Sequence, residues 1–499
     1  MIPVLHTRKV DVIMSHKVRT RFAPSPTGYM HIGNLRTALY EYLTAKHEGG
    51  DFILRIEDTD RGRLVEGSVD VVFDTMRSVG LLWDEGPDVG GDYGPYIQSE
   101  RMGLYKSYAE ELVKQGKAYY CFCTPERLQA MHEQQKAEGE KAGFYDRHCR
   151  NLPQEEVQRL LESGAPYVIR QKIPLEGTTS FTDLVYGTIT VDNSTLDDQI
   201  LIKSDGMPTY NFANVVDDHL MKISHVVRGS EYISSTPKYN LLYEAFGWEI
   251  PAYIHCPPVM KDAHNKLSKR NGDASFADLV EQGYLSHAIL NYLLLLGWAP
   301  SPELESKEFF TMDEMIAAWD PTRISPSPSI FDIQKLQYFN AVYIRNMSEE
   351  DFKAAALPWI EQVSKSAADV DLLCRNLQPR TTIFSEIPGR VAFLSSVPEI
   401  DPELYRNKKQ KTTPESALEA LNILLPLLRE CEDWSVDGIF PACKERCKEL
   451  GKKPGWLLYP LGIALSGTTA TPGGGTDLAV ILGKDVTLER IERAIAALQ

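Results

Sequence analysis

One loop near the start of the chain has the residue types that a nucleotide-binding site needs. It begins at Arg21, runs through two prolines and Ser25 to Gly28, and is followed by His31 and Gly33. The two glycines remove side chains where a base or a phosphate must approach the backbone. Free N–H groups at a helix start favour negative charge, and His31 can donate a hydrogen bond to a phosphoryl oxygen. The loop predicts a phosphate site, although a single loop histidine is more often a solvated or capping residue.

A cluster of cations stands far downstream, in the polar segment 261–272. Lys266, Lys269 and Arg270 place three positive charges within five residues, with Ser268 between them. Fixed cations suit the negative charge that builds up on phosphates during transfer. The alternative is a solvated surface loop, which is the commoner structure for any basic pentapeptide taken alone.

Three cysteines form a separate pattern. Cys121 and Cys123 are two residues apart, and Cys149 follows after 26 further positions. Two thiols close in sequence with a distant third are typical of tetrahedral zinc sites, which need four ligands. Three reduced cysteines in a small core would give the same pattern, so both interpretations stay open.

The nucleotide loop is flanked by periodic segments that would position it. Residues 17–22 alternate like a strand, and Leu35, Ala38, Leu39, Tyr42 and Leu43 share one face of a helix. Residues 51–56 then form an apolar run that predicts a buried strand. Strand, loop, helix and strand in this order build parallel sheets, which bind ligands where the loop meets the helix. We expect two further strands, at 200–202 and around 226–227, to complete this sheet.

The chain changes character after a Ser/Pro-rich segment at 325–329, which is typical of a domain boundary. Beyond it, segments such as 418–428 and 488–498 have helical periodicity. The last 170 or so residues are therefore predicted to be mainly helical.

Composition bounds the function less sharply than the motifs do. The chain has 499 residues and a net charge of −16, which by itself would not indicate nucleic-acid binding. Only the contacting face must be basic, however, and cations cluster at 406–411 and 444–453. No run reaches the length of a membrane span and no signal peptide is evident, so we expect a cytoplasmic protein with reduced cysteines. Met14 directly precedes the first strand, so residues 1–13 are either an extension or a misassigned start.

The loop around His31 and the loop around Lys269 together resemble the paired signatures of class I aminoacyl-tRNA synthetases. This chain has Asn34 at the final histidine position of the first signature, and Leu267 and Arg270 as variants in the second. Further blocks between residues 17 and 345 resemble bacterial glutamyl-tRNA synthetases: 21–28, 55–60, 84–87, 96–101, 203–206, 208–210 and 214–218.

This resemblance implies an α/β fold with a Rossmann-like catalytic domain, an inserted domain and helical domains after it. Residues 14–100 and 201–254 would form the catalytic domain, and 101–200 the insertion that holds the acceptor end of tRNA. Residues 255–330 would form a stem-contact domain that includes the Lys266–Arg270 loop. Residues 331–400 and 401–499 would form helical anticodon-binding domains.

The resemblance also implies the reaction and its residues. L-glutamate would react with ATP, accompanied by Mg²⁺, to give glutamyl-adenylate, and the glutamyl group would pass to the terminal adenosine of tRNA(Glu). The catalytic residues would be His31, Lys266 and Lys269, with Gly28, Gly33 and Ser268 also at ATP. Glutamate would be bound by Arg21, Ala23, Ser25, Glu57, Tyr210, Asn214 and Arg228. Arginines face carboxylates well because their planar fork makes two parallel hydrogen bonds.

Two further sites follow from the same resemblance. Some relatives complete a zinc site with a tyrosine oxygen, which here would be Tyr145, or alternatively His148. Arg380 matches an arginine that reads the last anticodon base, which predicts an enzyme that rejects tRNA(Gln); a non-discriminating enzyme is the alternative. Gly462 stands at a position where the family usually has arginine. An anticodon contact of that arginine therefore cannot be assigned to this chain.

Three other identities compete with a monomeric glutamate–tRNA ligase. A glutaminyl enzyme would carry β-barrels in its C-terminal region, and a tRNA-modifying paralogue would be truncated, whereas this chain predicts 170 or so helical residues there. A catalytically silent tRNA-binding protein would not need His31, Lys266 and Lys269. The sequence therefore favours the ligase.

Overall fold

The computed structural model describes residues 17–26, 28, 30–59, 62, 64–139, 144–267, 275–396 and 399–499. The chain divides into two compact units. The first comprises Met1–Ala277 and Leu290–Phe331, and the second comprises Asp278–Ile289 and Asp332–Gln499. Each unit is described by itself.

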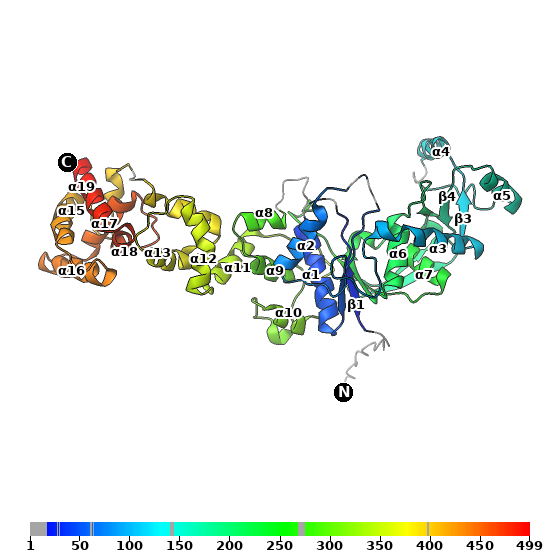
Figure 1. The fold of residues 1–499 in the computed structure, drawn as a ribbon, viewed down its shortest axis with the longest axis horizontal. Helices are drawn as coiled ribbons and strands as arrows, with labels where there is room; N and C mark the ends of the chain where they lie inside the picture. Colours follow the sequence, from blue (N-terminus) through cyan, green and yellow to red (C-terminus); the bar gives the residue numbers. More distant parts are fainter. Residues whose placement is uncertain are drawn as a thin grey trace, which may run out of the picture. The chain divides into compact units, whose positions relative to one another are not determined.

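The first unit is built around the strand–loop–helix–strand segment that the sequence predicts. Strand β1 (Arg19–Phe22) pairs in parallel with β2 (Asp51–Leu54), and helix α1 (Ile32–His47) connects them. All four residues of β1 are buried. Helix α1 buries its apolar face, Leu35, Ala38, Leu39 and Leu43 included. The prediction for residues 17–56 is confirmed, and Figure 1 shows α1 beside β1.

A four-stranded sheet lies next to this segment. Its order is β6 (Gly187–Asp192), β5 (Thr178–Asp183), β9 (Ala252–Cys256) and β8 (His225–Gly229). Strands β8 and β9 are parallel, with Arg228 opposite His255, and β5 joins β9 in parallel at Asp183. The sheet continues toward β1, because the Ser224 amide donates to the Arg19 carbonyl at 3.0 Å. The carboxyl ends of β1, β8 and β9 therefore lie together.

A third sheet consists of β3 (Ala118–Cys121), β4 (Val168–Gln171) and β7 (Ile200–Ile202), all antiparallel. The prediction that residues 200–202 complete the nucleotide-binding sheet is therefore wrong. Three consecutive apolar residues indicate a buried strand but carry no information about which sheet contains it. In Figure 1 three helices lie beside these strands: α3 (Met102–Lys114), α6 (Tyr210–Leu220) and α7 (Thr236–Phe246).

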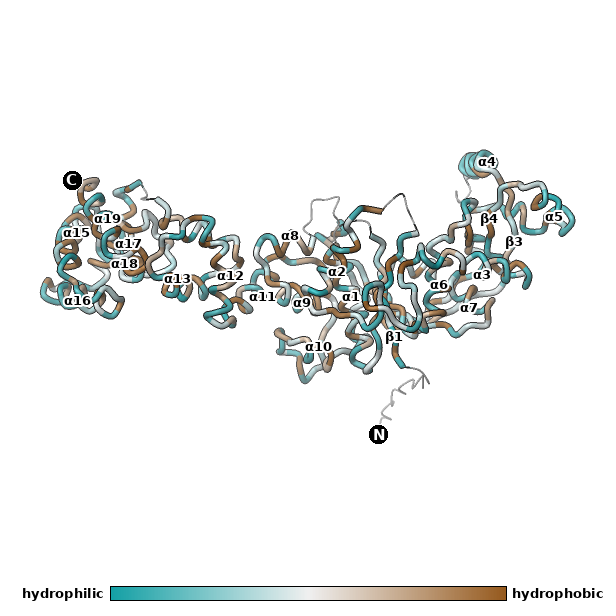
Figure 2. The backbone as a smooth tube through the Cα atoms, viewed as in Figure 1, coloured by the Kyte–Doolittle hydropathy of each residue, from teal (hydrophilic) through white to brown (hydrophobic). Residues whose placement is uncertain are grey.

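The first unit contains further α-helices and strands. They are α2 (Ser68–Ser78), α4 (Pro125–Ala137), α5 (Gln154–Glu162), β10 (Val259–Met260), α10 (Met312–Ala318) and β11 (Ser329–Ile330). Helix α4 has no buried residue, and it is teal in Figure 2. Helices α8 (Phe276–Glu281) and α9 (Ser286–Leu294) contain two of the three points at which the chain passes from one unit to the other, and the third lies between Phe331 and Asp332.

The second unit is helical, as predicted. Its helices are α11 (Ile333–Arg345), α12 (Glu349–Glu361), α13 (Val370–Leu377), α14 (Ile387–Arg390), α15 (Pro414–Arg429), α16 (Val436–Glu449), α17 (Gly455–Ser466), α18 (Gly475–Leu482) and α19 (Lys484–Leu498). One apolar cluster extends through this unit, from Ile344 to Ile495. Among the described residues of the whole chain, no helix combines the length and the apolar character that crossing a bilayer requires.

Candidate active site and metal centre

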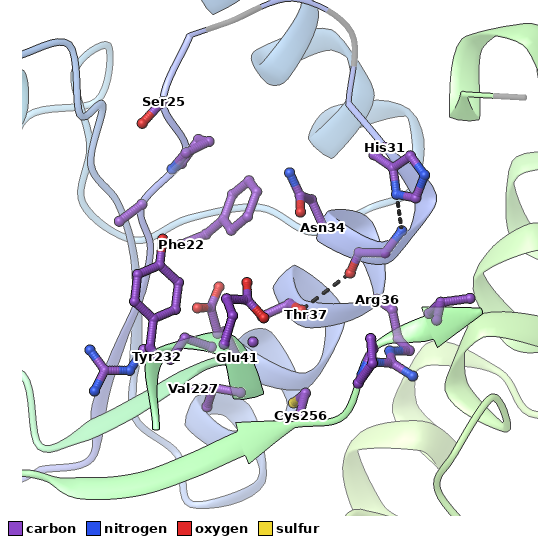
Figure 3. Close-up of a pocket in the computed structure, with 18 of the residues that line it drawn as sticks. Phe22, Ser25, His31, Asn34, Arg36, Thr37, Glu41, Val227, Tyr232 and Cys256 are labelled. Carbon is purple, nitrogen blue, oxygen red and sulfur yellow. Dashed lines mark hydrogen bonds between the residues drawn. The ribbon is translucent and has the colours of Figure 1, made fainter. Parts of the chain in front are cut away.

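A cavity of about 760 Å³ lies where β1, β8 and β9 end and α1 begins. This is the position where open parallel sheets bind ligands, and the volume is that of a small-molecule site. In Figure 3 His31 and Arg36 lie at one end of the cavity and Ser25 and Tyr232 at the other, with Glu41 between them. Charged residues of both signs line it: Arg21, Arg36, Arg228, Lys266, Glu41, Glu57 and Glu231.

His31 is held at the start of α1 as its N-cap. Its Nδ1 accepts a hydrogen bond from the Gly33 amide at 3.1 Å (Figure 3). A neutral His31 therefore carries its ring proton on Nε2. A Cβ at position 33 would lie 3.2 Å from Nδ1, so glycine leaves the ring in place. Lys266, which pairs with Met260 in a β-bridge, lines the same cavity. Helix start, imidazole and ammonium together suit a phosphate chain.

A buried ion network supports the other end of the cavity. Asp218 accepts from Arg21 at 3.0 Å and from Arg55 at 2.7 Å, and none of the three side chains is more than 4% exposed. Arg55 also donates to Glu57 at 2.9 Å. Burial alone would raise the pKa of Asp218, but the two guanidinium groups lower it. The charges of Arg21 and Arg55 are thus largely matched before any ligand binds.

Arg228 differs from these two arginines. It is 6% exposed, and no carboxylate of a described residue forms an ion pair with it. Its Nε donates to His255 and its Nη2 to Thr236, at 3.1 and 2.7 Å, while Nη1 has no hydrogen bond to a described residue. A buried cation without a carboxylate is costly, so this group is poised for an anionic ligand.

Two carboxylates in the cavity have raised pKa values because they are buried. Glu57 is 4% exposed and Glu41 is 2% exposed. Glu41 Oε1 lies 3.4 Å from Arg21, and its Oε2 has no hydrogen bond to any described residue. With both Arg228 and Glu57 in its lining, the cavity can bind a ligand that carries both a carboxylate and an ammonium group.

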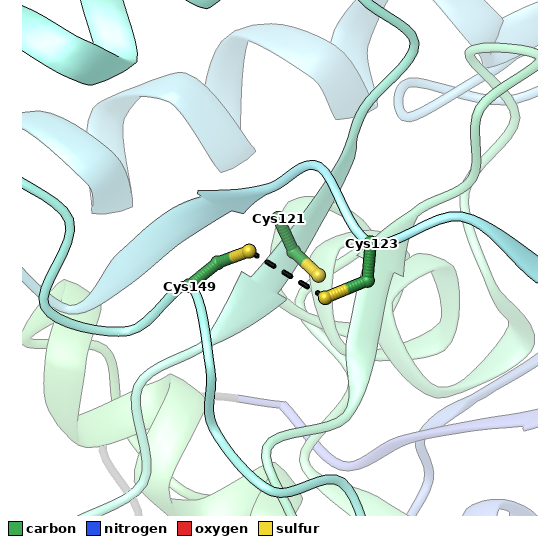
Figure 4. Close-up of side chains that lie close together, drawn as sticks. All are labelled: Cys121, Cys123 and Cys149. Carbon is green, nitrogen blue, oxygen red and sulfur yellow. Dashed lines mark hydrogen bonds between the residues drawn. The ribbon is translucent and has the colours of Figure 1, made fainter. Parts of the chain in front are cut away.

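The three cysteines come together, as Figure 4 shows: Cys121 ends strand β3, and Cys123 and Cys149 lie in loops. Their sulfur atoms lie within 4.8 Å of one another, and Cys123 Sγ is 3.6 Å from Cys149 Sγ. The Tyr145 hydroxyl is 3.2 Å from Cys121 Sγ and 3.3 Å from Cys123 Sγ. Four zinc ligands at bond lengths of about 2.3 Å would be spaced on this scale, so the donor set fits zinc.

Electrostatics around the cysteines also suit a metal. The hydrogen bond from Cys149 lowers the pKa of Cys121, and the same hydrogen bond raises the pKa of Cys149. Cys121 is therefore the thiol of this pair that ionises first. Thiolates are the form that binds metal. Tyr145 is buried whereas His148 is exposed, so the geometry favours the tyrosine oxygen over the imidazole as the fourth ligand.

Comparison with known proteins decides the family. The family described as tRNA synthetases class I (E and Q), catalytic domain, matches residues 17–338, and an anticodon binding domain matches residues 351–495. The chain is 55% identical over 487 residues to the glutamate–tRNA ligase of Clostridium botulinum strain Hall, covering 97% of this chain and 99% of that one. The chain belongs to the glutamate–tRNA ligase family.

Other relatives agree with this assignment. The glutamate–tRNA ligase of Clostridium acetobutylicum is also 55% identical over 487 residues, covering 97% of this chain and 99% of that one. A crystal structure of a glutamate–tRNA ligase from Elizabethkingia meningosepticum, in complex with its amino acid, superposes with a TM-score of 0.89 at 36% identity. It covers 97% of this chain and 100% of that one. The class I resemblance and the fold class are confirmed.

Most of the predicted site residues that the structure describes line the cavity. They are Arg21, Ala23, Ser25, His31, Gly33, Glu57, Tyr210, Arg228 and Lys266. Asn214 is buried on α6, one turn after Tyr210, and is not among the described lining residues. Gly28 has a φ of 115°, which favours glycine, and does not line the cavity either. Ser268 and Lys269 lie outside the described residues.

Several lining residues were not predicted. Glu41 is the most notable, together with Arg36, Thr37 and Tyr232. A signal for Glu41 did exist, because Gly33, Thr37 and Glu41 are spaced by four and therefore share one face of α1. The Thr37 hydroxyl donates to the Gly33 carbonyl at 3.2 Å along this face, and Figure 3 draws the bond as a dashed line beside Thr37.

The predicted anticodon residue lies on the second unit. Arg380 is exposed, and its Nη1 donates to the Asn376 carbonyl at 2.8 Å. Gly462 lies in α17 against α18, where a Cβ on Gly475 would be 2.5 Å from the Leu458 carbonyl. A Cβ on Gly462 would make only ordinary contact with Gly475, at 3.8 Å. The close approach of these helices therefore depends on Gly475.

Proposed function

We propose that the cavity is the site where this glutamate–tRNA ligase activates L-glutamate with ATP. The substrate carboxylate attacks the α-phosphorus, pyrophosphate leaves, and the glutamyl group of the adenylate then passes to the terminal adenosine of tRNA(Glu), releasing AMP. The observation that carries the proposal is Arg228, a buried cation that pairs with no carboxylate of the described residues, in the same cavity as Glu57. Glutamate supplies the anion that Arg228 lacks and an ammonium group for Glu57.

In this proposal one end of the cavity binds glutamate and the other end binds ATP. Arg228 and Arg21 face the carboxylates, Glu57 faces the ammonium group, and Ala23, Ser25, Tyr210 and Asn214 complete the amino-acid pocket. Arg21 already pairs with Asp218, so Arg228 contributes more to substrate affinity. At the other end, His31, Gly33 and Lys266 line the cavity, and His31 and Lys266 stabilise charge on the phosphates of ATP. The family resemblance assigns Lys269, Ser268 and Gly28 to ATP as well. Mg²⁺ accompanies the ATP.

A structural zinc ion belongs to the same proposal. Cys121, Cys123, Tyr145 and Cys149 would hold it, and the spacing of their donor atoms supports this set. When bound, zinc stabilises the fold around the sheet of β3, β4 and β7 and takes no part in catalysis. The cysteines do not line the cavity that holds His31 and Arg228.

The tRNA contacts extend the proposal to the rest of the chain. Residues 101–200 receive the acceptor end, residues 255–330 contact the stem, and residues 331–499 bind the anticodon. Arg380 is exposed and presents only donors, which suits the acceptor edge of the last anticodon base, so we assign a discriminating enzyme. A non-discriminating enzyme that also charges tRNA(Gln) is the alternative. From the tRNA substrate we infer a cytoplasmic location.

Pyrophosphate exchange tests the site. With glutamate, ATP and tRNA present, the wild type should exchange labelled pyrophosphate, and Lys269→Ala should slow the exchange roughly 10²- to 10³-fold, as expected for the loss of one preorganised charge. Lys261→Ala, in the same segment but outside the cavity lining, is the matched control. An unchanged rate in Lys269→Ala would remove that residue from the site.

A further inference from the structure

The guanidinium of Arg228 is held by two neutral groups. Its Nε donates to His255 Nε2 at 3.1 Å, and its Nη2 donates to the Thr236 hydroxyl at 2.7 Å. The rings of Tyr232, Tyr239 and Tyr253 surround the guanidinium carbon at 4.8–5.4 Å. These contacts fix the plane of the guanidinium without neutralising its charge.

The chemistry of arginine fixes the protonation of His255. An arginine Nε–H can only donate, so His255 Nε2 must be the acceptor. The imidazole proton is therefore on Nδ1, which lies 2.7 Å from Asp183 Oδ2. Burial also lowers the pKa of His255, which agrees with a neutral ring. The hydrogen bonds thus run in one direction, from Arg228 to His255 to Asp183.

Asp183 is itself fixed by the end of its strand. One oxygen accepts from the amides of Val185 and Tyr186, both at 2.9 Å, and the other also accepts from the His255 amide at 3.0 Å. The three residues lie side by side on the neighbouring strands β5, β9 and β8, where Arg228 stands opposite His255 in the register. Asp183 and His255 are both no more than 1% exposed.

We propose that Asp183 and His255 are positioning residues that orient Arg228 toward the carboxylate of bound glutamate. This inference rests on the function proposed above for the cavity. The ionised Asp183 fixes the histidine tautomer, and the neutral imidazole then holds the guanidinium in place. The His255 ring lies between Asp183 and Arg228. The negative charge of Asp183 therefore stabilises the buried arginine but does not occupy the side of the guanidinium that faces the substrate.

The test is a double-mutant cycle that measures KM for glutamate and for ATP. His255→Phe keeps a ring but accepts no hydrogen bond, and should raise the glutamate KM at least about tenfold, the usual scale for a lost hydrogen bond to a charged group. The ATP KM and kcat should change by less than about twofold, because uniform substrate binding is what is lost. His255→Gln, which can both accept and donate, should lie closer to the wild type.

The cycle separates positioning from a merely structural role. In an Arg228→Met background, His255→Phe should have almost no further effect on the glutamate KM, because the positioned group is gone. Additive effects, or equal increases in the KM for glutamate and ATP, would overturn the inference. If Arg228→Met alone leaves the glutamate KM unchanged, the proposed role of Arg228 fails instead. Should His255→Phe not fold, Asp183→Asn, which removes the charge that fixes the His255 tautomer, replaces it in the same cycle with the same expected pattern.

Discussion

Replacing Arg228 with methionine should weaken glutamate binding without a matching loss of stability. Methionine keeps much of the aliphatic volume but removes the charge. In the free protein Arg228 forms no ion pair with a described carboxylate, so the substitution leaves no such carboxylate without its partner. Among the residues that the structure describes, only His255 and Thr236 lose a hydrogen bond to Arg228.

The magnitude follows from the kind of contact that is lost. A hydrogen bond to a charged group contributes about 1.5–3 kcal/mol, which corresponds to a roughly 10- to 150-fold increase in the Kd for glutamate. In the proposed arrangement ATP occupies the other end of the cavity, so its Kd should change less than about twofold. Calorimetric titration with each ligand measures both constants.

Arg55→Met is the matched control. Arg55 is also buried in this region, but it pairs with Asp218 and Glu57 at 2.7 and 2.9 Å. Its loss leaves buried carboxylates unpaired and should cost about 3–5 kcal/mol of folding stability. Thermal unfolding should therefore show a much larger drop in Tm for Arg55→Met than for Arg228→Met. Equal weakening of glutamate and ATP binding in Arg228→Met, or no weakening of either, would refute the reasoning.

Three further outcomes are expected. The purified protein should contain about one zinc ion per chain, and Cys121→Ser, but not Cys374→Ser, should lower both zinc content and Tm; elemental analysis that finds no zinc would end this assignment. Burial raises the pKa of Glu41 above its usual value of 4.5, so ionising Glu41 costs folding stability as the pH rises. Glu41→Gln should therefore have a higher Tm than the wild type at pH 8, with little difference near pH 4. A lower Tm for the variant at pH 8 would contradict this. Charging of tRNA(Gln) should be slow in the wild type and relatively faster in Arg380→Gln, by the 1–3 kcal/mol or so of one mismatched contact, with Arg375→Gln as control; similar kcat/KM for both tRNAs in the wild type would show a non-discriminating enzyme.

The fold was predictable where a local pattern determines it. The strand, loop, helix and strand between residues 17 and 56 follow from periodicity and glycine placement, and so do the helices of the second unit. The partner of residues 200–202 was not predictable, because strand pairing depends on distant segments that a three-residue apolar run does not specify.

Some of the site residues were likewise predictable from the sequence, and others were not. The cysteine spacing predicted a cluster that the structure brings together. Arg228 could be chosen only through the family resemblance, since nothing in its local sequence distinguishes it from a surface arginine. Asp183 and His255 carried no signal at all, because their contact joins strands 72 positions apart in the chain. Burial and pairing of charges become visible only in three dimensions.

The identity of the amino acid esterified to tRNA tests the central claim most directly. Wild-type protein should be incubated with ATP, Mg²⁺ and tRNA(Glu), and with each of the standard amino acids in turn, and the charged tRNA separated on acid gels. Glutamate should be attached to tRNA(Glu) and glutamine should not, since the cavity offers a buried cation to the substrate. Attachment of glutamine at a comparable rate, or no charging with glutamate, would contradict it.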